Sequence, residues 1–201
     1  MDNFAKFLSS SCYICSRRKT DVICDRCFNS LIPTSERFSL DIALYKYNET
    51  ASKILLMSKY PPYNFYTLKY LIRRSILDFS FTADTLLCPI PISSLKMFER
   101  KFNQADLIST EFAKKLGVSS HEILKRKTDT KPLFSLGKRQ RELELEDIFR
   151  PTRLGKFLAN KFQNIVLVDD LRTTGETLRQ AKQALATAGY KDVKSLTLFT
   201  T

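Results

Sequence analysis

The sequence predicts an α/β domain with a mainly parallel sheet flanked by helices, preceded by a small four-cysteine module. Residues 86–90 and 164–168 are apolar except for Asn164 and have the length of buried strands. A helical pattern over residues 178–188 follows the second run, and residues 191–199 alternate as a final strand. Strands that alternate with helices are typical of parallel sheets. A chain of 201 residues is long enough for one such domain with a small appendage.

The appendage lies near the N-terminus, where four of the five cysteines follow the pattern Cys12-x2-Cys15-x8-Cys24-x2-Cys27. Each Cys-x2-Cys turn directs two thiolates to one point, so two turns can close a tetrahedral site around a structural Zn²⁺. Two disulfides and a redox-active pair are the alternatives. A reducing compartment disfavours disulfides, and two closely spaced copies favour a metal. We therefore predict a zinc module within residues 1–40, and we interpret Cys88 as a core residue.

The chain carries a formal net charge of +12, which favours polyanionic ligands such as nucleic acid, phosphates or an anionic membrane surface. Residues 46–74 contribute +5 of this surplus and residues 96–160 contribute +6. No apolar run reaches the roughly 18 residues of a membrane span. The first eleven residues lack the pattern of a signal peptide. We therefore expect a cytoplasmic protein with no membrane span.

A phosphate-binding turn is predicted directly after the strand at residues 164–168. Asp169 and Asp170 end this strand, and the segment 171–177 (LRTTGET) precedes the helix. Ligands of open α/β sheets bind at the carboxyl ends of the strands. Loop amides, threonine hydroxyls and a helix N-terminus together suit a phosphate dianion, and Gly175 permits close backbone approach. Two adjacent carboxylates suit a pair of sugar hydroxyls; alternatively, they only cap the turn.

At these residues the chain resembles the type I phosphoribosyltransferases, whose signature is a hydrophobic strand, two acidic residues and Thr-Thr-Gly-x-Thr. The resemblance implies that Asp169 and Asp170 hold the ribose hydroxyls of phosphoribosyl pyrophosphate (PRPP). It also implies that the 5′-phosphate is bound by Thr173, Thr174, Gly175, Glu176 and Thr177. Glu176 departs from the small residue usual in this family. A side chain that points outward leaves the phosphate site intact, whereas one that points inward would repel phosphate.

The middle of the chain indicates which family of phosphoribosyltransferase-like proteins the chain resembles. The strand at 86–90 runs into Pro89-Ile90-Pro91, and Ser93 or Ser94 is expected to cap a helix that leads into residues 99–108 (ERKFNQADLI). Residues 126–141 are basic and contain threonines, which suits a loop that closes on pyrophosphate. Together with the four-cysteine module and the terminal motif, this order resembles the ComF (ComFC-like) family over residues 12–201. Lys101, Leu133 and Glu144 depart from the family pattern, and the last two bear on turnover more than on binding.

The ComF resemblance implies a competence protein for natural transformation, which binds PRPP with Mg²⁺ and single-stranded DNA and assists DNA uptake on the cytosolic side. Pyrophosphate would bind near Pro91 and Arg100, and Mg²⁺ would bridge the pyrophosphate and the ribose. The alternative for Arg100 and the basic loop is a solvated face. Further partners would be other proteins of the DNA-uptake machinery, with this protein peripheral at the inner membrane. The sequence assigns no catalytic residue.

Residues 45–75 form a basic and aromatic segment, which the resemblance places as the hood of a domain over residues 41–201. Six of the eight tyrosines fall here, interleaved with lysines and arginines. Aromatic faces stack on bases and cations meet phosphates, which suits single-stranded nucleic acid. The predicted DNA contacts are Lys59, Tyr60, Lys69, Arg73 and Arg74. The alternative is that several tyrosines pack in the core.

Two functions therefore remain open at the level of sequence. The first is the DNA-handling competence protein, favoured by the four-cysteine module and the basic aromatic segment. The alternative is an active soluble phosphoribosyltransferase that transfers phosphoribosyl to a base or small amine. A weaker third possibility is a sensor that uses the sugar phosphate only as a regulatory ligand. The motif for the sugar phosphate fits all three, so the sequence leaves enzymatic activity undecided.

Overall fold

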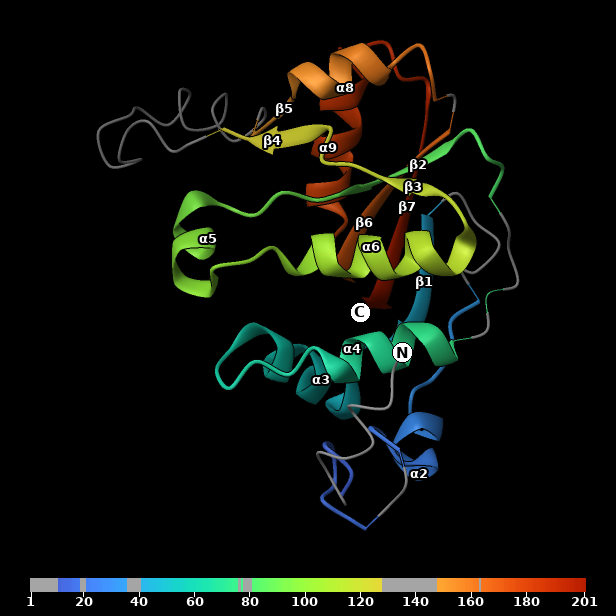
Figure 1. Ribbon diagram of the computed structural model, residues 1–201, viewed down its shortest axis with the longest axis vertical. Helices are drawn as coiled ribbons and strands as arrows, with labels where there is room; N and C mark the ends of the chain where they lie inside the picture. The colour runs from blue at the N-terminus through green and yellow to red at the C-terminus, as the bar shows by residue number, and fades with distance from the viewer. Residues whose placement is uncertain are drawn as a thin grey trace.

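The computed structural model describes residues 11–18, 21–35, 41–75, 77, 81–127, 148–162 and 164–201. Its main sheet has five parallel strands in the order β1-β7-β6-β2-β3 (Figure 1). Their bounds are Asp41–Lys46, Asp192–Thr200, Asn164–Arg172, Thr85–Pro89 and Ser119–Ser120 in that order. A separate antiparallel pair joins β4 (Leu124–Arg126) to β5 (Phe149–Pro151). The predicted parallel α/β architecture is therefore confirmed.

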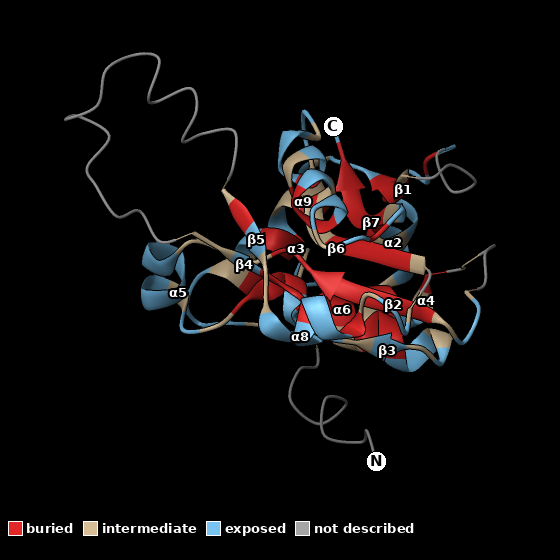
Figure 2. Ribbon diagram, turned by 90° about the horizontal axis from the view of Figure 1, so that it is seen from above, coloured by how far each residue is buried: buried red, intermediate tan, exposed pale blue. Residues whose placement is uncertain are grey.

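Helices cover both faces of this sheet. Their bounds are α2 Asp25–Asn29, α3 Glu49–Lys59, α4 Tyr66–Arg74, α5 Ser94–Arg100, α6 Gln104–Leu116, α8 Arg153–Leu158 and α9 Glu176–Ala186. Within β6, Val166 and Val168 join a core that includes α3, α4 and α6, whereas Ile165 and Leu167 join a core that includes α9. Because successive strand residues point to opposite faces, β6 is buried from both sides (Figure 2).

The predicted strands appear as β2, β6 and β7, with β6 continuing through both aspartates to Arg172. Ser93 caps α5, because its side chain accepts a hydrogen bond from the Lys96 N–H. The helix expected to lead into residues 99–108 is divided into α5 and α6. Lys101 ends α5 with a left-handed φ of 63°, and the Asn103 side chain then caps α6.

The predicted hood contains α3 and α4, which pack beside α6 below the sheet (Figure 1). Tyr45 is a core residue, 3% exposed, and its hydroxyl hydrogen-bonds Ser75 Oγ at 3.0 Å. The core alternative therefore holds for Tyr45, whereas Tyr60, Tyr63 and Tyr66 are exposed. Cys88 is fully buried, as expected. None of the helices in the described part of the chain is long and apolar enough to cross a membrane.

Candidate functional site

The main candidate site is a pocket of about 160 Å³ at the carboxyl ends of β2 and β6. This edge of a parallel sheet is where ligands of open α/β folds bind. The pocket combines the two aspartates of β6 with cations and polar groups from five other elements, α3, α5, α6, β4 and α9. Its lining residues are Lys59, Ile90, Pro91, Ile92, Lys96, Arg100, Asn103, Gln104, Ala105, Arg126, Asp169, Asp170 and Thr177. Asp169, Asp170, Thr177, Pro91 and Arg100, predicted from separate parts of the sequence, thus face one cavity.

The aspartate pair sits in an asymmetric environment. Asp169 Oδ1 accepts a hydrogen bond from the Asp170 N–H at 2.9 Å. Burial, together with the charge of Asp170, raises the pKa of Asp169 to about 8. Asp170 Oδ2 lies 2.5 Å from Lys59 Nζ, and these side chains are 13% and 22% exposed. The ion pair between Lys59 and Asp170 therefore lies beside an Asp169 carboxyl that retains its proton at neutral pH.

The phosphate-binding turn follows β6 and leads into α9. Gly175 has a φ of 77°, a conformation that favours glycine. Thr173 and Thr174 are exposed, and Thr174 Oγ1 accepts a hydrogen bond from the Glu176 N–H at 3.4 Å.

Glu176 lies on the outer surface of α9. Its carboxylate accepts hydrogen bonds from Arg179 at 2.8 and 2.6 Å and from Gln180 at 2.8 Å. These partners hold the pKa of Glu176 at about 2. They are three and four residues further along the same helix, so the carboxylate is directed along α9 rather than into the turn. The structure thus has the outward arrangement, which leaves the turn free for a phosphate.

The end of α3 contacts the pocket directly. Ser58 Oγ accepts a hydrogen bond from Gln104 Nε2, and Lys59 pairs with Asp170. The Arg100 guanidinium carbon lies 5.9 Å from the centre of the Tyr60 ring. Of the predicted DNA contacts, Lys59 therefore lines the pocket, and Tyr60 lies near the pocket residue Arg100. The segment containing α3 and α4 therefore contacts residues of the pocket through Ser58, Lys59 and Tyr60.

The other predicted DNA contacts lie elsewhere. Arg73 and Lys69 lie 3.4 and 3.9 Å from the buried carboxylate of Glu111, which also pairs with Lys114 at 3.2 Å. Arg74 instead faces the N-terminal module, where it pairs with Asp25 at 2.5 Å and stacks over the Phe28 ring. The five residues therefore belong to three places: the pocket, the α4–α6 surface and the N-terminal module.

The four predicted zinc ligands converge at the N-terminal module. The sulfur atoms of Cys12, Cys15, Cys24 and Cys27 all lie within 4.8 Å of one another, and all four cysteines are free thiols. Although burial alone would raise the pKa of Cys12, backbone N–H groups lower it to about 6. Burial and the neighbouring sulfurs raise the pKa of Cys27. Four clustered sulfurs suit a tetrahedral thiolate-binding ion such as zinc, so the donor set fits the predicted metal.

Part of the predicted basic loop falls outside the described residues. Arg126 and Lys127 are described, and Arg126 lines the pocket. Leu133 and Glu144, the two departures that bear on turnover, lie outside that part of the chain.

Comparison with known proteins gives consistent matches. The family model "Phosphoribosyl transferase domain" matches residues 110–201. Competence protein F of Haemophilus influenzae is 27% identical over 110 residues, which cover 54% of this chain and 47% of that protein. Competence protein ComFC of Bacillus subtilis is 31% identical over 204 residues, which cover 96% of this chain and 79% of that protein. The chain thus spans about half of the first relative and most of the second.

Proposed function

The chain belongs to the ComF (ComFC-like) family of competence proteins and contains a phosphoribosyltransferase domain; on that premise, we propose that it binds PRPP with Mg²⁺ and single-stranded DNA. It would thereby assist DNA uptake in natural transformation, on the cytosolic side and peripheral to the inner membrane. Other proteins of the uptake machinery would be its partners there.

PRPP binding is supported by one observation above all: a single pocket contains an acidic pair together with several cations. Asp169 and Asp170 would hold the ribose hydroxyls, and the turn over residues 173–177 would hold the 5′-phosphate through its amides. Arg100 would meet the pyrophosphate beside Pro91. Lys96 and Arg126, which also line the pocket, would add positive charge around the same group.

Magnesium would bind together with the ligand. It prefers oxygen donors and keeps several waters, and the carboxylates of Asp169 and Asp170 supply oxygens beside the place proposed for the ribose. The ion would neutralise pyrophosphate charge. Lys59 would act from the hood side: since it pairs with Asp170, a ribose hydroxyl that donates to Asp170 must share or replace this contact. Ligand binding would therefore change the contact that holds the end of α3 to β6.

The second candidate is an active soluble phosphoribosyltransferase acting on a base or small amine. Four pocket cations, Lys59, Lys96, Arg100 and Arg126, favour it, because stabilising the charge that develops on departing pyrophosphate is the main demand of such a reaction. The same cations also serve tight binding without turnover, so a measurement of pyrophosphate release separates the two candidates.

The test is a titration of fluorescently labelled single-stranded DNA with and without PRPP and Mg²⁺, with pyrophosphate release assayed in parallel. We expect DNA binding that weakens steeply with salt, because counterions are released. We also expect PRPP to change the DNA affinity without steady turnover. An Asp169→Asn, Asp170→Asn variant should lose this PRPP effect while retaining DNA binding. Steady pyrophosphate release with a defined acceptor would establish the second candidate instead.

A further inference from the structure

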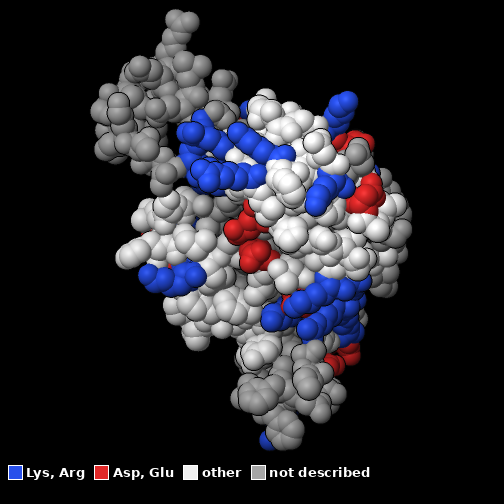
Figure 3. Space-filling model, turned by 45° about the horizontal axis from the view of Figure 1, so that its top comes forward, with Lys and Arg blue, Asp and Glu red and all other residues white. Residues whose placement is uncertain are grey.

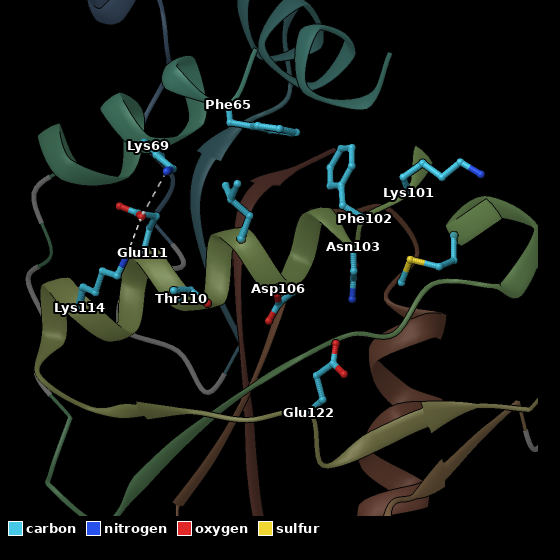
Figure 4. A pocket seen from close by; sticks show the side chains of 12 residues that line it. Phe65, Lys69, Lys101, Phe102, Asn103, Asp106, Thr110, Glu111, Lys114 and Glu122 are labelled. Carbon is cyan, nitrogen blue, oxygen red and sulfur yellow. Dashed lines mark hydrogen bonds and ion pairs between the residues drawn. The ribbon is translucent and has the colours of Figure 1, made fainter. Parts of the chain in front are cut away.

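A second hollow, with a volume of about 460 Å³, runs along the outer face of α6 (Figure 4). The face is formed by residues at helical spacing: Asn103, Asp106, Leu107, Thr110, Glu111 and Lys114. Phe65 and Lys69 from the α4 region, the end of α5 and Glu122 complete the lining. We call this hollow the α6 groove. It shares Asn103 with the sugar-phosphate pocket, so the two sites adjoin.

One wall of the α6 groove is aromatic. The Phe65 and Phe102 rings lie 4.7 Å apart at 81°, and Tyr63 stacks with Phe65 at 6.0 Å. Tyr63 also meets Phe102 edge-on at 5.2 Å. These mutual contacts fix the rings in place, while Tyr63 remains 37% exposed and Phe65 is half-buried. A fixed and partly open aromatic surface is suited to stacking by a nucleobase.

Cations stand at both ends of the groove. Lys69 and Lys114 lie at one end, where they pair with Glu111 at 3.9 and 3.2 Å. Lys101 lies at the other end, where its ammonium is 4.1 Å from the centre of the Phe98 ring and its side chain extends away from Asp106 and Glu122 (Figure 4). Its φ of 63° is in the left-handed region that favours glycine. This conformation ends α5, where a glycine is the residue that it favours.

Two carboxylates on the same surface have no side-chain partner among the described residues. Asp106 and Glu122 are exposed, line the groove and make no ion pair or side-chain hydrogen bond within the described part of the chain. Acidic atoms lie between separate Lys and Arg patches on the face in Figure 3. A carboxylate accepts hydrogen bonds and donates none, so it can bind the N4 amino group of cytosine, whereas thymine offers only the O4 acceptor there.

We propose that the α6 groove is the single-stranded DNA site and that it prefers bases with an exocyclic amino group over thymine. One base would stack against the aromatic wall, the phosphates would meet the lysines at the two ends, and the two carboxylates would select the amino group. This inference rests on the DNA half of the proposed function. Of the five DNA contacts predicted from the sequence, it keeps Lys69 and leaves out the four that do not line the groove: Lys59, Tyr60, Arg73 and Arg74.

The test measures the affinity of the full chain for labelled oligo(dC) and oligo(dT) of equal length by fluorescence anisotropy. We expect the wild type to bind oligo(dC) about fivefold more tightly than oligo(dT). Asp106→Asn, Glu122→Gln should reduce that ratio to below about twofold. Lys101→Gly should weaken both oligonucleotides equally and lower the salt slope by about one. Because glycine suits a positive φ, this variant should remain folded. Lys191→Gln, which removes an exposed charge at the opposite end of the sheet, is the matched control.

The outcomes distinguish DNA binding by the chain from the assignment of that binding to the α6 groove. If the wild type binds DNA but the groove variants behave like Lys191→Gln, the groove assignment is overturned while DNA binding stands. If the wild type prefers thymine and the carboxylate variant leaves the ratio unchanged, the selection of amino groups is overturned. If the wild type binds neither oligonucleotide, the DNA half of the proposed function fails together with the groove.

Discussion

Lys59→Met is predicted to destabilise the protein far more than Asp170→Asn, although each breaks the same ion pair. Lys59 Nζ lies 2.5 Å from Asp170 Oδ2 in a contact whose side chains are 22% and 13% exposed. Loss of the ammonium leaves Asp170 charged and unpaired beside Asp169. Loss of the Asp170 charge instead removes the repulsion on Asp169 and leaves Lys59 close enough to neutralise it.

The magnitude follows from the burial of the pair. Removing one partner of a fully buried pair costs about 3–5 kcal/mol, and the residual exposure of this pair reduces the expected cost of Lys59→Met to about 2 kcal/mol. Asp170→Asn should cost less than about 1 kcal/mol, because no unpaired charge remains. Asp169 has a folded pKa of about 8, raised by burial and by Asp170. It therefore gains its charge as the pH rises through 8, and the cost of Lys59→Met should be larger at pH 9 than at pH 6.

The assay is urea denaturation followed by far-UV circular dichroism, since the chain contains no tryptophan. Wild type, both single variants and the double variant would be compared at pH 6 and pH 9. The double variant should recover most of the stability lost in Lys59→Met. Equal costs for the two single variants, with no difference between the two pH values, would refute this electrostatic account of the pocket.

Three further predictions concern other parts of the structure. Wild-type stability should fall between pH 6 and pH 8, because the folded state retains the Asp169 proton that the unfolded state has lost; Asp169→Asn should reduce this slope in thermal melts, and an unchanged slope would contradict the raised pKa. Gly155→Ala should cost about 2 kcal/mol in urea unfolding, since its Cβ would collide with the Ile123 carbonyl oxygen; a cost near zero would argue against this packing. Purified protein should contain one zinc per chain by elemental analysis, and a strong chelator should lower Tm; a melt insensitive to chelation and to Cys12→Ser would count against the metal site.

The parts that sequence predicts well are those with local causes. The buried part of β6, residues 165–168, is predictable because a strand buried on both faces is a continuous apolar run. The cap at Ser93 and the positive φ at Gly175 follow from the chemistry of single residues. The sequence alone leaves the direction of Glu176 open, although Arg179 and Gln180 stand at the spacing that favours an outward side chain on a helix.

The parts that sequence could not predict depend on packing between distant segments. Nothing local to Lys59 indicates that its ammonium reaches Asp170, because that contact exists only after α3 packs beside the end of β6. The same holds for the hydrogen bond between Ser58 and Gln104. The sequence predicts Lys59 to be a DNA contact, and this stays a prediction; the tertiary structure adds that its ammonium lies beside Asp170 in the pocket.

The central claim is that the pocket beside the end of α3 binds PRPP with Mg²⁺ through its aspartate pair. Isothermal titration calorimetry of PRPP in the presence of Mg²⁺ tests it most directly, with the wild type compared with Asp169→Asn, Asp170→Asn. The account predicts saturable binding at one site per chain in the wild type, and at least a tenfold loss of affinity, about 1.4 kcal/mol, in the double variant. Wild-type affinity in a folded double variant, or no binding by the wild type, would contradict it.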